Sequence, residues 1–99
     1  MTTEQKNTLV HAINHYGVEH QIDKSIEEMG ELVTELARRR LDRGSREAIA
    51  EEIADVIIMA NQLRIIYGGK LVDEIIDRKL ARLERNINST KPLDKIWRY

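Results

Sequence analysis

The chain has 99 residues, of which 41% are apolar and 33% are charged, with a formal net charge of −1. One domain is the default at this length, and the balanced charge excludes a general electrostatic attraction to nucleic acid or to a membrane surface. Without cysteine there is no disulfide or thiolate chemistry, and the longest apolar run, 56–60, is too short to span a bilayer. With no signal-peptide pattern at Met1, we expect a cytoplasmic protein.

Apolar residues recur every three to four positions, which predicts helices and no strands. The first helix is expected to begin at Thr2, with Gln5 as the partner in a capping box, and to end at Gly17. Its expected inward residues are Leu9, Val10, Ile13 and Tyr16. A second helix is expected over about 22–41. Its apolar stripe consists of Ile22, Ile26, Met29, Val33, Leu36 and Ala37.

A third helix is expected after Gly44-Ser45, because glycine ends one helix and serine caps the next. It ends at Gly68-Gly69, and a fourth helix follows up to Asn88. The tail over 88–99 is expected to be extended, with Trp97 packed on the helices or on a partner chain.

These elements predict an all-α fold with a four-helix bundle-like core in a single domain, 1–99. Four helices in a chain this short make a thin bundle. Ile58 and Ile66 also lie off the main apolar stripe of the third helix. We therefore expect a homodimer or a homotetramer, a dimer of dimers, that buries the surplus apolar surface.

Two pairs of acidic residues have the same spacing in the second and third helices. Glu28 and Glu31 share one helix face, and so do Glu52 and Asp55, because residues three apart lie side by side on a helix. If the two helices pack antiparallel, the pairs oppose each other. Four converging carboxylates repel one another unless a cation compensates.

Carboxylate oxygens are ligands that Mg²⁺ or Mn²⁺ prefers. Magnesium also shares its coordination sphere with substrate phosphates, so the predicted site suits a nucleotide. The alternative is an ordinary solvated helix face, since Glu-x-x-Glu is common on surface helices. Gly30 is unfavourable within a helix, and its position among the acids suggests close approach of another backbone or of a ligand.

The acidic segments read Glu-Glu-Met-Gly-Glu-Leu from Glu27 and Glu-Glu-Ile-Ala-Asp-Val from Glu51, with twenty residues between Glu31 and Glu52. Over about 21–86 the chain resembles the MazG-type branch of the all-α NTP pyrophosphohydrolases, so the core is expected over about 21–87. The resemblance implies hydrolysis of a nucleoside or deoxynucleoside triphosphate to the monophosphate and pyrophosphate. The metal-binding and catalytic residues that it implies are Glu28, Glu31, Glu52 and Asp55. Glu27 is expected to point away from them.

Family members carry basic residues on the helix that follows the Glu-x-x-Asp helix. Lys79 and Arg82 share a face there and are the candidates for contact with substrate phosphate. Lys24, one turn before Glu28, is a third candidate. The alternative for all three is a solvated salt bridge with a neighbouring acid.

Two rival functions belong to other classes. A ferritin-like di-metal bundle requires Glu-x-x-His, which this sequence lacks. A non-catalytic helical interaction module that kept the fold stays open. His11, His15 and His20 are expected to be surface residues, and the basic cluster around 38–40 has no aromatic platform for nucleic acid.

Overall fold

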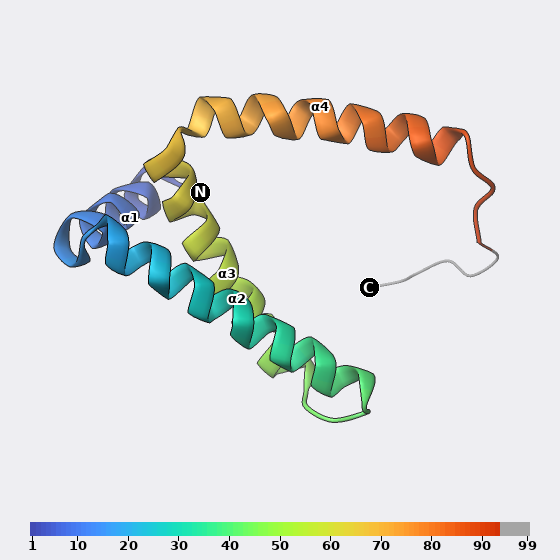
Figure 1. The fold of residues 1–99 in the computed structure, drawn as a ribbon, viewed down its shortest axis with the longest axis horizontal. Helices are drawn as coiled ribbons and strands as arrows, with labels where there is room; N and C mark the ends of the chain where they lie inside the picture. Colours follow the sequence, from blue (N-terminus) through green and yellow to red (C-terminus); the bar gives the residue numbers. More distant parts are fainter. Residues whose placement is uncertain (94–99) are drawn as a thin grey trace. The chain divides into compact units, whose positions relative to one another are not determined.

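The computed structural model describes residues 1–93, and the regular structure within this range is helical throughout. The helices are α1 (Thr3–Tyr16), α2 (Val18–Arg40), α3 (Arg46–Tyr67) and α4 (Gly69–Asn88), as Figure 1 shows. The described residues contain no strand, so the predicted all-α class is confirmed. The expected packing of Trp97 lies outside the described residues.

Side-chain caps begin two of the helices where the sequence predicts them. Thr2 Oγ1 accepts from the Gln5 N–H at 3.0 Å, and Gln5 Oε1 accepts from the Thr2 N–H at 2.9 Å. Ser45 Oγ accepts from the Ala48 N–H at 3.0 Å. Both predicted caps are confirmed, and they satisfy backbone donors that have no partner within the helix.

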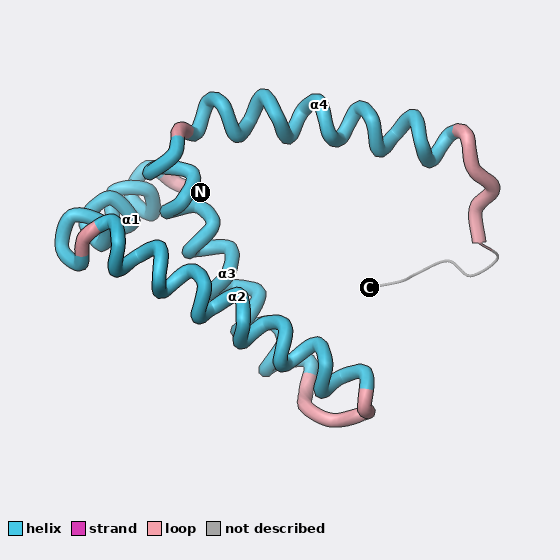
Figure 2. The backbone as a smooth tube through the Cα atoms, viewed as in Figure 1, coloured by secondary structure: helices cyan, strands magenta, loops and turns pink. Residues whose placement is uncertain are grey.

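Single glycines connect α1 to α2 and α3 to α4 (Figure 2). Gly17 has φ of 93° and Gly68 has φ of 111°, values that strain any residue with a Cβ atom. Because Gly17 completes the turn by itself, α2 begins at Val18, four residues earlier than predicted. The fourth helix includes Asn88, where the sequence predicted the start of the tail.

The chain divides into two compact units, 1–67 and 68–99. In the first unit, α2 and α3 lie side by side and antiparallel and make the most extensive helix contact, while α1 packs against both (Figure 1). The predicted antiparallel arrangement of the two acidic helices is therefore confirmed. The second unit contains α4.

The interface between α2 and α3 buries polar side chains as well as apolar ones. Gln21, Ser25 and Glu28 are buried on α2, and Met59 and Gln62 are buried on α3. The Gln21 side-chain amide donates to Gln62 Oε1 at 2.7 Å, and Ser25 Oγ donates to the Gln21 carbonyl at 2.7 Å. These hydrogen bonds make burial of the polar groups tolerable.

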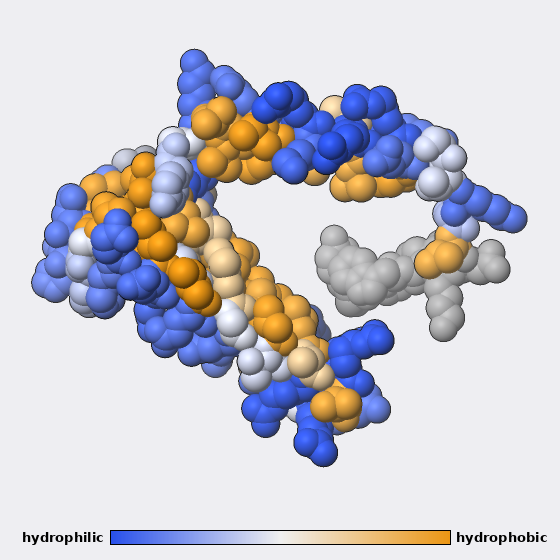
Figure 3. Space-filling model, viewed as in Figure 1, coloured by the Kyte–Doolittle hydropathy of each residue, from blue (hydrophilic) through white to orange (hydrophobic). Residues whose placement is uncertain are grey.

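The apolar stripe of α2 is largely exposed. Ile26 is 65% exposed and Val33 is 66% exposed. Met29 and Leu36 are exposed as well. Figure 3 shows apolar side chains in a band along α2 and α3. The exposed isoleucines of α3 are Ile53, Ile57, Ile58 and Ile65.

The prediction for α1 is partly wrong. Leu9 and Ile13 are buried as expected, whereas Val10 and Tyr16 are exposed. Val10 follows Leu9 directly and so lies about 100° around the helix from it. Tyr16 is the last residue of α1, where its ring stacks on His20 with 5.2 Å between ring centroids. None of the helices within 1–93 is long and apolar enough to cross a bilayer.

Candidate metal centre

Three predicted site residues meet across the interface between α2 and α3. One carboxylate oxygen each from Glu28, Glu52 and Asp55 lies within 4.8 Å of the other two. Glu28 comes from α2, while Glu52 and Asp55 are one turn apart on α3. The antiparallel packing therefore brings three of the four predicted acids together, and we call them the inter-helix acids.

The fourth predicted acid, Glu31, belongs to a second carboxylate group on α2. One oxygen each from Glu27, Glu28 and Glu31 lies within 4.8 Å of the other two. We call these three the α2 acids, and Glu28 is common to both groups. Glu27, which was expected to point away from the four predicted acids, is exposed and lies outside the inter-helix acids. Its carboxylate nevertheless approaches Glu28 and Glu31, and its Oε1 lies 3.5 Å from Lys24 Nζ.

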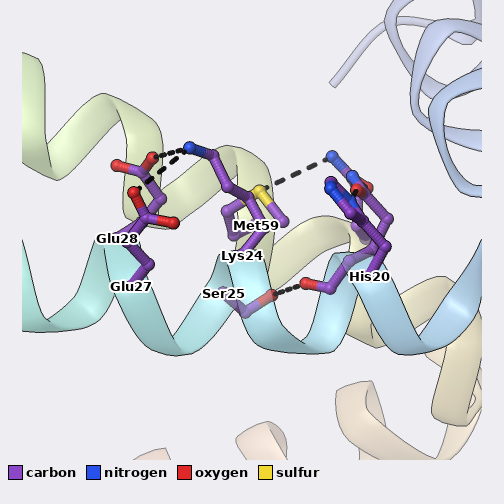
Figure 4. Close-up of polar contacts among 8 residues, drawn as sticks. His20, Lys24, Ser25, Glu27, Glu28 and Met59 are labelled. Atoms are coloured by element: carbon purple, nitrogen blue, oxygen red, sulfur yellow. Dashed lines mark hydrogen bonds and ion pairs between the residues drawn. The ribbon is translucent and has the colours of Figure 1, made fainter. Parts of the chain in front are cut away.

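Glu28 is the most buried residue of the candidate site, with 8% of its surface exposed. Its Oε1 lies 3.2 Å from Lys24 Nζ (Figure 4). Its Oε2 is buried and has no hydrogen-bond partner among the described residues. Glu52 Oε2 is likewise buried and without a hydrogen-bond partner there. A buried acceptor without a partner costs about 1–3 kcal/mol, and more when it is charged. A bound cation would remove this cost at both oxygens.

The neighbouring charges perturb two further groups. Repulsion from Glu28 raises the pKa of Glu31, with smaller contributions from desolvation and from Glu52. The pKa of Glu31 is therefore raised by acids on both α2 and α3. The hydrogen bond to Glu28 raises the pKa of Lys24, and attraction to Glu27 acts in the same direction.

The donor set fits a hard divalent cation. Its oxygens are all carboxylate, which suits Mg²⁺ or Mn²⁺ better than zinc or copper. Two ligands of one Mg²⁺ lie about 3–4 Å apart, given metal–oxygen distances of about 2.1 Å. The oxygens of the inter-helix acids lie within 4.8 Å of one another, which is close to this spacing.

The candidate phosphate-binding residues lie in different parts of the chain. Lys24 contacts the α2 acids directly. Lys79 and Arg82 belong to α4, where they line a shallow hollow together with Ile75, Arg78 and Arg85. The predicted i, i+3 pair on α4 therefore shares one surface within the second unit.

Two polar residues that no motif singles out continue the line of Glu28 along α2. Gln21 and Ser25 precede it by seven and three residues, a spacing that places all three on one face. Gln62 accepts a hydrogen bond from Gln21, and its Nε2 lies 3.7 Å from Met59 Sδ. The signal available in the sequence was this run of polar residues at helical spacing.

Two other predictions concern Gly30 and the histidines. No atom of the described chain lies within 4 Å of the position that a Cβ on Gly30 would take, its own helix backbone aside. The suggested close approach of another backbone of this chain is therefore wrong. His11, His15 and His20 are exposed, as predicted.

Comparison of the chain with protein-family models, with curated proteins and with solved structures finds no match.

Proposed function

We propose that this protein is a Mg²⁺-dependent nucleoside triphosphate pyrophosphohydrolase, with Mn²⁺ as an alternative metal. The observation that carries the proposal is the pair of buried carboxylate oxygens without a partner, Glu28 Oε2 and Glu52 Oε2. Both belong to a group of three acids drawn from two helices. The resemblance of the motifs supplies the reaction, which splits an NTP or dNTP into the monophosphate and pyrophosphate.

The inter-helix acids would hold the metal, and Glu31 on α2 is the further metal-binding candidate that the resemblance implies. When bound, Mg²⁺ neutralises charge on the phosphates and lowers the pKa of a coordinated water. One of the carboxylates then positions the attacking water or accepts its proton. Lys24 would contact the phosphates beside these acids, where a positive charge is worth most. The resemblance adds Lys79 and Arg82 of α4 as further candidates for contact with phosphate. Nucleoside triphosphates are abundant in the cytoplasm, which is the location that we infer.

We further propose that the protein works as a homodimer or homotetramer. The exposed stripe of α2 supports this assembly, because Ile26 and Val33 are each about two-thirds exposed. Burying one such side chain contributes about 1.5–3 kcal/mol. A second copy of the chain offers the same apolar stripe, as a two-fold symmetric interface requires.

A non-catalytic interaction module is the second candidate function. The same exposed apolar residues favour it, since they suit partner binding whether or not the acids turn over a substrate. The two functions differ in one property, the release of pyrophosphate.

Pyrophosphate release from a panel of NTPs and dNTPs, with Mg²⁺, Mn²⁺ or EDTA, tests the proposed activity. We expect metal-dependent release by the wild type and its loss, by at least about 100-fold, in Glu52→Gln and Asp55→Asn, since each removes a charged ligand. Glu51→Gln is the matched control, because Glu51 is exposed and outside both acid groups.

Circular dichroism should show nearly the same helicity in all three variants. Retained activity in both Glu52→Gln and Asp55→Asn would remove the site assignment. A wild type that binds the metal and releases no pyrophosphate from any nucleotide would favour the interaction module.

A further inference from the structure

Lys24 lies against the α2 acids as a positive charge supplied by the protein itself. Its Nζ is 3.2 Å from Glu28 Oε1 and 3.5 Å from Glu27 Oε1 (Figure 4). The partners follow Lys24 by three and four residues on the same helix, so the contact depends on α2 alone. The ammonium group therefore sits where two of these three carboxylates converge.

Glu28 has two oxygens in different surroundings. Oε1 pairs with Lys24, whereas Oε2 is buried without a partner among the described residues. One of the Glu28 oxygens also lies within 4.8 Å of carboxylate oxygens of Glu52 and Asp55. A carboxylate whose two oxygens face two separate positions is the arrangement that bridges paired cations in two-metal sites. In this chain one of those positions already holds the Lys24 ammonium.

From this geometry we propose that Lys24 takes the place of a second metal ion, so that each site binds one divalent cation. The cation is held by the inter-helix acids, and the ammonium neutralises the α2 acids on the other side of Glu28. This proposal rests on the proposed metal site. It adds the number of cations that the site binds and names Lys24 as the residue that determines this number.

The physical reason is local charge. The three α2 acids carry a formal charge of −3 between them, and their oxygens lie within 4.8 Å of one another. The Lys24 ammonium offsets part of this charge and repels a divalent ion that approaches the same oxygens. Removing the ammonium leaves Glu27 and Glu31 free to share a second ion with Glu28.

Titration of the full-length protein with Mn²⁺, followed by electron paramagnetic resonance of the free ion, counts the bound ions per chain. We expect one ion in the wild type and two in Lys24→Met. Lys24→Arg keeps the positive charge and should bind one ion. Arg38→Met is the matched control, since Arg38 pairs with Glu35 at 3.5 Å on the same helix and lies outside both acid groups.

Two ions in the wild type, or a single ion in Lys24→Met, would overturn the role of Lys24 while leaving the metal site in place. No bound ion in the wild type would overturn the proposed metal site as well. The readout is a stoichiometry and does not depend on catalytic turnover.

Discussion

Glu28 and Glu52 place carboxylate oxygens where an interface between helices normally buries apolar side chains. Each has one buried oxygen without a hydrogen-bond partner among the described residues. Residues that oppose folding in this way are expected at functional sites, where binding of a ligand offsets their cost. The buried oxygens without partners at these two residues therefore distinguish the candidate site from an ordinary helix interface.

Glu31 should make the metal-free protein less stable at neutral pH. Its pKa is raised, chiefly by repulsion from Glu28, so the folded state binds this proton more tightly than the unfolded state does. The ionised carboxylate therefore opposes folding above the raised pKa, and the effect disappears as the pH falls below the ordinary value of 4.5.

Glu31→Gln, measured by thermal unfolding in EDTA, is expected to raise the melting temperature slightly at pH 7 and to have no effect near pH 4. Glu51→Gln, which changes an acid outside both groups, is the control and should show no such pH-dependent gain. A lower melting temperature for Glu31→Gln at pH 7 would show that the carboxylate stabilises the fold.

α2 and α3 are aligned by a hydrogen bond as well as by packing. Gln21 and Gln62 are 41 positions apart in sequence, and their side chains meet at 2.7 Å in the buried interface. The exposed His20 extends this contact toward the surface, because its Nδ1 lies 2.8 Å from Oε1 of the buried Gln21. Because an unpaired buried amide is costly, this contact favours one register of the two helices over others.

Gln62→Leu should destabilise the first unit by about 1–3 kcal/mol, because it leaves the buried Gln21 amide without its acceptor. In Gln21→Leu/Gln62→Leu no amide remains unpaired, so most of that loss should be recovered. Urea denaturation of both single variants and the double variant gives the coupling energy. Purely additive effects would contradict a specific Gln21–Gln62 contact.

Large apolar side chains are exposed in both units of the described chain. The exposed stripe of α2 and the exposed isoleucines of α3 belong to one unit. On α4, five large apolar residues are exposed as well, namely Leu71, Ile76, Leu80, Leu83 and Ile87. A helix of about twenty residues is only marginally stable in water, and in a protein most of its stability comes from packing of its apolar face. For this reason we propose that several copies of the chain assemble.

Sedimentation of the wild type should give a dimer or a larger species. Ile26→Gln/Val33→Gln should shift it toward the 11.5 kDa monomer, because each lost apolar contact costs about 1.5–3 kcal/mol per side chain. Thr34→Gln is the control, as Thr34 is an exposed polar neighbour of Val33. A wild-type monomer would contradict the proposed assembly.

The sequence by itself determined the helices and most of their ends. Helix ends depend on contacts and dihedral preferences within a few residues, as at Thr2, Ser45 and Gly17. They can therefore be predicted from the local sequence. The spacing of Glu52 and Asp55 also determined that both lie on one face of α3. Their meeting with Glu28 required the antiparallel packing that the short connection favours and, in addition, burial of the Glu28 face of α2.

Only the tertiary structure decided which face of α2 meets α3. The apolar stripe around Ile26 and Val33 predicts the buried side, yet it is exposed, and the line from Gln21 through Ser25 to Glu28 is buried instead. Burial of a helix face depends on the surface that packs against it, and the partner of Gln21 lies 41 residues away. The helical spacing of Gln21, Ser25 and Glu28 shows that they share one face, but it does not show which surface packs against that face.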